Sequence, residues 1–342
     1  MSPTIAIDSN SHLHVAWSDG EIPGNTEIYY KKSTNGGVTW TNKRLSWTSG
    51  LSLSSAIAVN SSNHIHVVWS EETPANAEIF YKKSTDGGAT WSSKRLTWTS
   101  GNSRWPAIAV DSSNHIHVVC YDDTPGNYNI YYKKSTDQGA TWSTRRLSWG
   151  SDSSGDPAIA VDSNNHIQVV WYYYPTISNA EIYHTKSTDG GISWSTKRLT
   201  WNTRHSYAPA IAADSNNHLH VVWQDSSPGN WEIFYKRSTD GGTIWTTKRL
   251  TDNADTSSGP HVTVDSNNYL HVTWFDSTPG NKELYYTRST NGGVTWTDKR
   301  LTWNPGQSES PAITADSDNH LHLVWTDDTS GNQEIYYRKG IQ

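Results

Sequence analysis

The sequence predicts an all-β protein, a seven-bladed β-propeller, on three observations. Its 342 residues include 19 Trp and 18 Tyr but only 3 Phe and 1 Met. Ser, Thr, Asn, Asp and Gly dominate the remainder, and this composition favours strands and turns over helices. A marker Asp or Asn recurs at positions 8, 60, 111, 162, 214, 265 and 316, always 51 or 52 residues apart. Four antiparallel strands in about 50 residues form one propeller blade.

Each repeat is expected to supply four strands in the same order, which the second unit illustrates. The first is the alternating run at 56–59, and the second runs from His64 to Trp69. The third begins at Glu78, and the fourth lies in the Lys-Arg-Leu-Thr segment that starts at Lys94. Because the connecting loops are short and rich in Pro, Gly and Asn, neighbouring strands should be antiparallel.

We expect residues 1–342 to form a single domain. The seventh unit ends after its third strand, at Gly340, and the first unit begins with a first strand. The last blade should therefore have three strands and no terminal strand to latch it, with side-chain packing between the first and seventh blades at the seam. The blades are expected at approximately 2–52, 53–104, 105–155, 156–207, 208–258, 259–309 and 310–342.

A second motif lies between the third and fourth strands of six units. The Asp or Asn side chain can accept backbone N–H groups across the turn, and Gly supplies a left-handed backbone conformation. The Trp that follows buries a large ring. A structural role is therefore expected for Ser33, Asn35, Gly37, Trp40, Ser84, Asp86, Gly88, Trp91, Ser135, Asp137, Gly139, Trp142, Ser187, Asp189, Gly191, Trp194, Ser238, Asp240, Gly242, Trp245, Ser289, Asn291, Gly293 and Trp296.

This Ser-x-Asp-x-Gly-x-Thr-Trp pattern resembles the Asp-box, or bacterial neuraminidase repeat, of sialidase-like β-propellers. Its six copies stand in fixed register and cover essentially the whole chain. The close likeness of the units resembles a highly symmetrical, recently amplified propeller. The resemblance implies that the Asp-boxes are structural and lie on the face away from the ligand site.

Repetition separates architecture from candidate function. Trp closes the second strand in every unit except the third, where Cys120 stands as a small buried apolar substitute. Histidines such as His64 and His66 recur two residues apart and point to one face. Metal binding by these pairs, or calcium binding by the Asp-Ser-Asn turns, is less favoured than packing or hydrogen bonds to the turn. No metal and no cofactor is therefore predicted.

Irregular residues concentrate around the loops after the second and fourth strands, on the face opposite the Asp-boxes. Exposed aromatic rings near Asp and Asn suit carbohydrate recognition, because rings stack on sugar C–H faces while polar groups bind hydroxyls. Neutral drift of a loop face is the open alternative. The candidate ligand-binding residues are Arg104, Trp105, Tyr121, Tyr172, Arg204, Tyr207 and Trp231.

Catalysis is not expected. The resemblance to sialidases implies three clamping arginines, a Tyr–Glu pair, an Asp acid and an early Arg-Ile-Pro segment, in a ring that generally has six blades. Arg-Ile-Pro is missing from this sequence, and Arg104 and Arg204 are one arginine short of the clamp. Loop acids such as Asp122 and Asp225 repeat, whereas an acid–base pair needs two different environments.

The leading hypothesis is a non-catalytic, monomeric propeller that binds a glycan or another polar ligand. A protein-interaction or spacer domain of a larger surface protein is the alternative, and a glycoside hydrolase is less favoured. The net charge of −6 carries no basic block, so nucleic acid is not an expected partner. No apolar run is long enough for membrane insertion. The Ser- and Trp-rich composition favours an extracellular or cell-surface location, although no signal peptide precedes Ser2 in this sequence.

Overall fold

The computed structural model describes residues 1–22, 25–124, 126–150, 152–175 and 179–341. Every regular element among these residues is a β-strand, and the 27 strands form seven sheets. The chain divides into two compact units, Met1–Ile159 and Ala160–Gln342, and each unit is described by itself. Within the described ranges no helix has the length and apolar character needed to cross a membrane.

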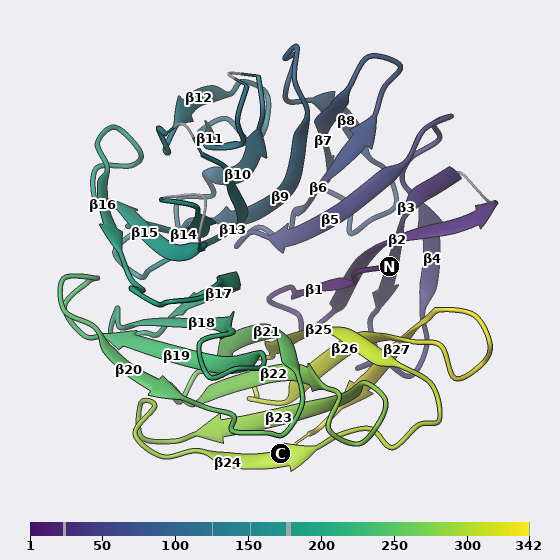
Figure 1. The fold of residues 1–342 in the computed structure, drawn as a ribbon. Helices are drawn as coiled ribbons and strands as arrows, with labels where there is room; N and C mark the ends of the chain where they lie inside the picture. Colours follow the sequence, from purple (N-terminus) through teal and green to yellow (C-terminus); the bar gives the residue numbers. More distant parts are fainter. Residues whose placement is uncertain (23–24, 125, 151, 176–178, 342) are drawn as a thin grey trace. The chain divides into compact units, whose positions relative to one another are not determined.

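The first unit holds three complete sheets and most of β13, and its strands are labelled in Figure 1. The sheets are β1-β2-β3-β4, β5-β6-β7-β8 and β9-β10-β11-β12, each in chain order. Their bounds are β1 (Thr4–Ile7), β2 (Leu13–Ile22), β3 (Asn25–Ser33), β4 (Thr41–Arg44), β5 (Ser52–Val59), β6 (Ile65–Glu72), β7 (Ala77–Ser84), β8 (Ser92–Arg95), β9 (Ser103–Val110), β10 (Ile116–Asp122), β11 (Asn129–Ser135), β12 (Ser143–Arg146) and β13 (Ser154–Val161).

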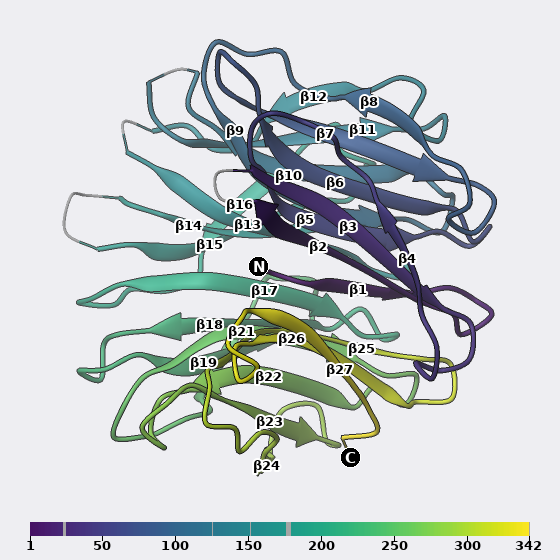
Figure 2. The same ribbon diagram turned by 90° about the vertical axis from the view of Figure 1, so that its right-hand side faces the viewer.

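The second unit holds the remaining strands, and Figure 2 shows β17, β18 and β19 of the fifth sheet side by side. The sheet that begins with β13 continues through β14, β15 and β16. The bounds are β14 (Ile167–Tyr173), β15 (Glu181–Ser187), β16 (Ser195–Arg198), β17 (Ser206–Ala213), β18 (Leu219–Asp225), β19 (Glu232–Ser238), β20 (Thr246–Arg249), β21 (Ser257–Val264), β22 (Leu270–Asp276), β23 (Glu283–Ser289), β24 (Thr297–Arg300), β25 (Ser308–Ala315), β26 (Leu321–Asp327) and β27 (Glu334–Lys339).

The predicted fold class is confirmed. Six sheets have four antiparallel strands, and the seventh, β25-β26-β27, has three strands in the described part of the chain. The second strand of each sheet is the most buried; in β6, residues 65–70 are all buried. A strand covered on both faces needs a nearly continuous apolar run, and Ile-His-Val-Val-Trp supplies one.

Neighbouring blades share their hydrophobic cores. Leu45, which follows β4 of the first blade, packs in one cluster with Ile57 and Trp69 of the second. Leu301 and Trp325 have the same relationship between the sixth and seventh blades. The strand-two Trp therefore fills the space between its own sheet and the preceding one, and its large ring contributes much of the apolar area that each joint buries.

Each Asp-box forms a hydrogen-bonded turn. In the second blade, Ser84 Oγ donates to Asp86 Oδ1 (2.8 Å) and accepts the Gly88 N–H (2.8 Å). Thr90 donates its hydroxyl to Asp86 Oδ2 and its N–H to Asp86 Oδ1 (2.9 Å), and these donors, together with Ser84, hold the pKa of Asp86 far below its usual value. Gly88 has φ +95°, and a Cβ there would lie 2.7 Å from Tyr30 Oη of the first blade. The box is thus a rigid turn fitted against the preceding blade.

The repeated histidines hold the turns, which confirms the hydrogen-bonding interpretation. His14 lies buried between two partners: its Nδ1 is 2.7 Å from Tyr30 Oη and its Nε2 is 3.3 Å from Asp8 Oδ2. His12 Nδ1 contacts the same carboxylate at 2.8 Å. The same Asp–His–Tyr chain recurs as Asp111–His117–Tyr132, Asp214–His220–Tyr235, Asp265–His271–Tyr286 and Asp316–His322–Tyr337.

The turns after the first strands are also linked from blade to blade. Ser9 donates both its N–H (3.0 Å) and its Oγ–H (2.9 Å) to Asn63 Oδ1 of the next blade. Asn63 adopts a left-handed conformation (φ 60°), which Asn tolerates better than most residues. Four further links of this kind are Ser61–Asn114, Ser163–Asn217, Ser215–Asn268 and Ser266–Asn319.

Candidate functional site: aromatic clusters at the blade ends

The irregular residues and the Asp-boxes lie at opposite ends of the blades. In the third sheet, Asp122 of β10 pairs with Ser103 at the start of β9 and with Asn129 at the start of β11. At the other end of β10, Ile116 pairs with Ser135, the first residue of the Asp-box. The predicted separation of the two motifs therefore holds within the blade.

The end opposite the Asp-boxes contains a repeated framework of buried carboxylates. Glu181, at the start of β15, is fully buried and pairs with Arg198 Nη2 at 2.8 Å. The equivalent pairs span 2.5–3.1 Å: Arg44–Glu27, Arg95–Glu78, Arg249–Glu232 and Arg300–Glu283. These repeated arginines therefore belong to the framework of the blades.

Asn side chains in the loops after the fourth strands connect these carboxylates between blades. Asn253 donates its backbone N–H to Glu232 Oε1 of its own blade (2.9 Å). Its Nδ2 donates to Asp276 Oδ2 of the next blade (2.5 Å). Asp276 also accepts the Ser257 hydroxyl (2.6 Å). The repeated loop acids are therefore held in place by several donors and belong to the blade joints.

A β-bulge near the start of the first strand projects several of the predicted residues. In β17 the pairing with β18 shifts between Tyr207 and Ala210, and Ala208 has φ +48°. Trp105 has the same conformation (φ +48°) in β9. Arg104, Trp105 and Tyr207 were expected in loops; this was wrong, because the strand continues across the bulge.

Five aromatic rings gather at this end in the second unit, and we call them the Tyr207 cluster: Tyr172, Tyr174, His205, Tyr207 and Trp231. The Tyr207 ring is central, with its centroid 4.9 Å from Tyr172, 5.4 Å from His205 and 5.6 Å from Trp231. Tyr174 contacts Tyr207 through both its ring (6.2 Å) and its hydroxyl. All five residues are partly exposed, so the cluster borders solvent.

His205 is oriented by the backbone. Ala180 N–H donates to His205 Nδ1 (3.2 Å), so this ring nitrogen is the acceptor. The ring then stacks on Tyr207 with 10° between the planes. Because each such ring pair contributes about 0.5–1.5 kcal/mol beyond area burial, the cluster is a preorganised platform.

A smaller cluster lies in the first unit. Trp105, which is 50% exposed, meets Tyr121 edge-on at 5.8 Å, and Tyr121 meets Tyr128 at 4.8 Å. Arg104 pairs with Glu72 (3.1 Å). Burial raises the pKa of Tyr121 to about 12. The expectation of exposed rings is therefore wrong for Tyr121, which is 8% exposed and serves as the support of Trp105.

The structure thus divides the seven predicted residues between two groups. Tyr172, Tyr207 and Trp231 meet in the Tyr207 cluster, and Arg104, Trp105 and Tyr121 are neighbours in the first unit. Arg204 is exposed, and the Tyr207 cluster forms without it. Tyr121 and Tyr172 were expected in loops but belong to β10 and β14, because these strands extend beyond the Trp register.

Tyr174 and His205 complete the cluster, although neither was among the residues predicted from the sequence. The available signal was the run Tyr172–Tyr174, which departs from the repeated acidic pair. The repeated Trp after the fourth strand is exposed, unlike the repeated Trp of the second strand. Trp47, Trp98, Trp149, Trp201 and Trp303 are 64–67% exposed, so repetition did not imply burial.

The fold and the Asp-boxes together define an Asp-box β-propeller. The sequence profile of the BNR repeat-like domain matches residues 11–218, and the chain belongs to this family. A comparison with curated proteins found no match.

Several solved structures share the fold at low sequence identity. An ulvan lyase from a new polysaccharide lyase family is 11% identical, with a TM-score of 0.69, over 97% of this chain and 90% of the lyase. The α-L-arabinofuranosidase of Fusarium graminearum is 14% identical, with a TM-score of 0.61 (84% and 92% of the chains). The intramolecular trans-sialidase of Ruminococcus gnavus is 13% identical, with a TM-score of 0.57 (100% and 94%). These likenesses concern the fold alone.

Proposed function

We propose that this protein binds a glycan without cleaving it, and that the Tyr207 cluster is the binding surface. The observation that carries the proposal is the convergence of five partly exposed aromatic rings on Tyr207. Aromatic rings present the apolar faces on which sugar C–H groups stack, and they lose little conformational entropy on binding. The cluster also offers hydroxyl groups for hydrogen bonds to the sugar.

The repeated acids support a binding role over catalysis. A glycosidase needs two carboxyl groups in different environments, roughly 5–10 Å apart. Asp225, on the blade nearest the Tyr207 cluster in sequence, accepts hydrogen bonds from Ser206 Oγ (2.8 Å) and Trp223 Nε1 (3.0 Å). Glu232 is fully buried and pairs with Arg249. Carboxylates saturated by blade-joint partners are poor candidates for proton transfer to a bound sugar.

Structural relatives favour glycans as the ligand class. They include a polysaccharide lyase, an arabinofuranosidase and a sialidase. Their activities belong to those proteins, and at 11–15% identity they supply only the expectation that this propeller fold accommodates sugar chains.

A glycan array followed by calorimetric titration of the best ligand tests the proposal. Trp231→Ala and Tyr207→Ala should each weaken binding by roughly 5- to 150-fold, since a stacked ring contributes on the order of 1–3 kcal/mol to such contacts. Trp303→Ala is the matched control, because it removes an exposed Trp outside the cluster. Equal losses in all three variants, or no saturable glycan binding by the wild type, would contradict the proposal.

Mass spectrometry of the recovered glycan separates binding from cleavage. We expect the ligand to be unchanged after prolonged incubation. Product that accumulates with wild type but not with Asp225→Asn would replace the binding proposal with a glycosidase or lyase.

A further inference from the structure

The third blade lacks an indole that every other blade contains. The strand-two Trp is 1–7% exposed at positions 17, 69, 171, 223, 274 and 325. Cys120 takes this place in β10 and is 1% exposed. It lies in one core cluster with Leu96, the counterpart of the Leu45 that contacts Trp69 in the preceding joint. The substitution removes most of a large ring from the joint between the second and third blades.

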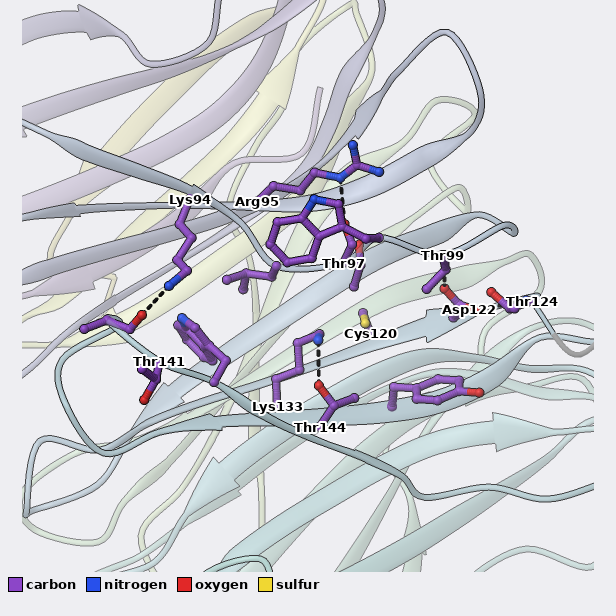
Figure 3. Close-up of a pocket in the computed structure, with 15 residues that line it drawn as sticks. Lys94, Arg95, Thr97, Thr99, Cys120, Asp122, Thr124, Lys133, Thr141 and Thr144 are labelled. Carbon is purple, nitrogen blue, oxygen red and sulfur yellow. Dashed lines mark hydrogen bonds between the residues drawn. The ribbon is translucent and has the colours of Figure 1, made fainter.

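A cavity of about 610 Å³, open to solvent on one side, lies at this joint, and Cys120, Asp122 and Lys133 form a buried floor beneath it that is 1%, 3% and 7% exposed. Leu96, Trp98, Cys120, Asp122, Tyr131 and Lys133 are among the residues that line it. Figure 3 shows Cys120 in this pocket between the labelled side chains of Lys133 and Asp122. The volume falls within the range of roughly 300–1,000 Å³ that is usual for small-molecule sites. The cavity lies wholly within the first unit, so it is separate from the Tyr207 cluster.

The other blades show which neighbours a ring in this position has. The Trp17 ring stacks on Tyr29 at 5.8 Å, and Lys31 Nζ lies 5.5 Å from the centroid of the same ring. In the second blade, Trp69 Nε1 donates to Glu71 Oε2 at 3.0 Å. The first blade shows all three contacts, because Trp17 Nε1 also donates to Asp19 Oδ2 (3.4 Å): a stacked ring, an ammonium group near the ring face and a carboxylate acceptor for the ring N–H.

All three partners are present in the third blade without the indole. Tyr131 pairs with Cys120 in the strand register, as Tyr29 pairs with Trp17. Asp122 stands two residues after Cys120, as Glu71 follows Trp69. Asp122 Oδ2 already accepts the Thr99 and Ser103 hydroxyls, and a ring N–H would be a further donor to it, as Trp223 Nε1 is to Asp225 Oδ2 beside the Ser206 hydroxyl. Lys133 is the counterpart of Lys31 and is only 7% exposed, and its Nζ donates to Thr144 Oγ1 (2.7 Å). Burial of this ammonium lowers the pKa of Lys133.

We infer that the third blade binds a planar bicyclic aromatic ligand with a ring N–H, of the indole type, in the Cys120 cavity. The ring stacks on Tyr131 and faces the Lys133 ammonium, which gains a cation–π contact. The ring N–H donates to Asp122, as Trp69 donates to Glu71. The cavity exceeds the volume of one indole, so ring substituents are accommodated. This inference does not depend on the proposed glycan binding.

Indole itself is the probe for the first test. Methyl groups of leucine are isotopically labelled in the full chain and followed by NMR during a titration with indole. Saturable shifts are expected at the Leu96 methyl groups. Leu45 is an internal control, because Trp69 already fills its joint and its resonances should stay unchanged. Absence of a saturable shift at Leu96, or equal shifts at both residues, overturns the inference.

A second test fills the cavity. Cys120→Trp restores the residue of the other six blades and should weaken indole binding at least tenfold in calorimetric titration. Cys120→Ala keeps the cavity and should bind as the wild type does. If Cys120→Trp does not fold, the inference is still tested by comparing the Leu96 and Leu45 methyl shifts of the wild type. Unchanged affinity in a folded Cys120→Trp variant overturns the inference.

A third test examines the ring N–H. Benzofuran has an oxygen in place of the indole N–H, and it should bind roughly tenfold more weakly, as expected for loss of a hydrogen bond to a charged acceptor. Lys133→Met should weaken indole binding by roughly threefold or more through loss of the cation–π contact. Equal affinity for indole and benzofuran would contradict the assigned orientation.

Discussion

Tyr30 of the first blade meets Trp91 of the second edge-on, with 5.1 Å between the ring centroids. The same Tyr hydroxyl contacts His14, so one side chain joins the core of its own blade to the Asp-box of the next. Equivalent ring pairs are Tyr81–Trp142 and Tyr235–Trp296. The Asp-box Trp is therefore a joint between blades as well as the end of a turn.

Trp91→Ala should destabilise the protein by about 3–5 kcal/mol, because truncation of a packed aromatic ring loses its burial and leaves a cavity. Trp149→Ala is the control, since Trp149 is 67% exposed and its loss should cost less than about 1 kcal/mol. Chemical denaturation of both variants measures the difference. Equal destabilisation would show that Trp91 does not hold the joint.

Gly88→Ala should also be destabilising. Its φ of +95° strains any L-residue, and the added Cβ would meet Tyr30 Oη at 2.7 Å. We expect a loss of roughly 2–3 kcal/mol from strain and contact together. Gly126→Ala isolates the strain, because Gly126 has φ +101° and a Cβ added there would have no atom within 4 Å. Thermal unfolding should give a lower melting temperature for Gly88→Ala than for Gly126→Ala. Identical melting temperatures would show that contact with Tyr30 adds nothing to the strain.

Arg198→Ala should destabilise the protein by about 3 kcal/mol or more, because it leaves the buried Glu181 without its ion-pair partner. Glu181→Gln should cost less, since a neutral amide already serves in the third blade. There Asn129 Oδ1 accepts from Arg146 Nη2 at 2.8 Å. Denaturant titration of the two variants provides the comparison; a larger loss in Glu181→Gln would argue against this account.

Acidification should reduce stability between about pH 6.5 and pH 4. Burial lowers the pKa of His14 to about 4 and that of His66 to about 3. In this range the unfolded histidine binds a proton that the folded one does not, so stability falls as the pH falls. The slope per histidine is on the order of 1 kcal/mol per pH unit.

His66→Gln provides the test of this pH dependence, because Gln168 occupies the equivalent position in the fourth blade and donates to Asp162 Oδ2 (3.3 Å). The variant should lose less stability between pH 6.5 and pH 4 than the wild type. His64→Gln is the control at a position nearer the surface. Identical pH profiles for wild type and His66→Gln would refute a role for His66.

The repeat made most of the fold predictable. The spacing of the marker Asp and the Asp-box pattern specified seven units, their strand order and the three-stranded last sheet. Hydrogen-bonded turns such as Asp8 to His12 depend on the local sequence, and a closely similar local sequence recurs in every repeat. The burial of individual side chains was harder to predict, because the position of a residue in the repeat does not reveal which side of a strand end faces solvent. Trp47 and Trp69 both repeat, yet one is exposed and the other is buried.

The candidate site was only partly predictable for a related reason. Departures from the repeat identified Tyr172, Tyr207 and Trp231, but the convergence of their rings also depends on the pairing of β17 with β18, which has a bulge before Ala210. Such a bulge depends on tertiary pairing, and Ala208 gives no local sign of its positive φ. The Cys120 cavity had a clear signal, the loss of one Trp from the series. The sequence alone did not show which groups would surround a ligand there. Those groups became apparent from the first blade, where Tyr29 and Lys31 contact the Trp17 ring.

The Ser9–Asn63 link joins residues 54 positions apart, and Ser61–Asn114 joins residues 53 apart. One repeat thus encodes both partners of this link: Ser61 donates to the following blade, and Asn63 accepts from the preceding blade. A tandem duplication of the gene segment would supply a new module already fitted to its neighbours on both flanks. An added repeat needs no new contact residues, because it already carries both partners of the link. Near-identical copies could therefore accumulate while a few positions diverged.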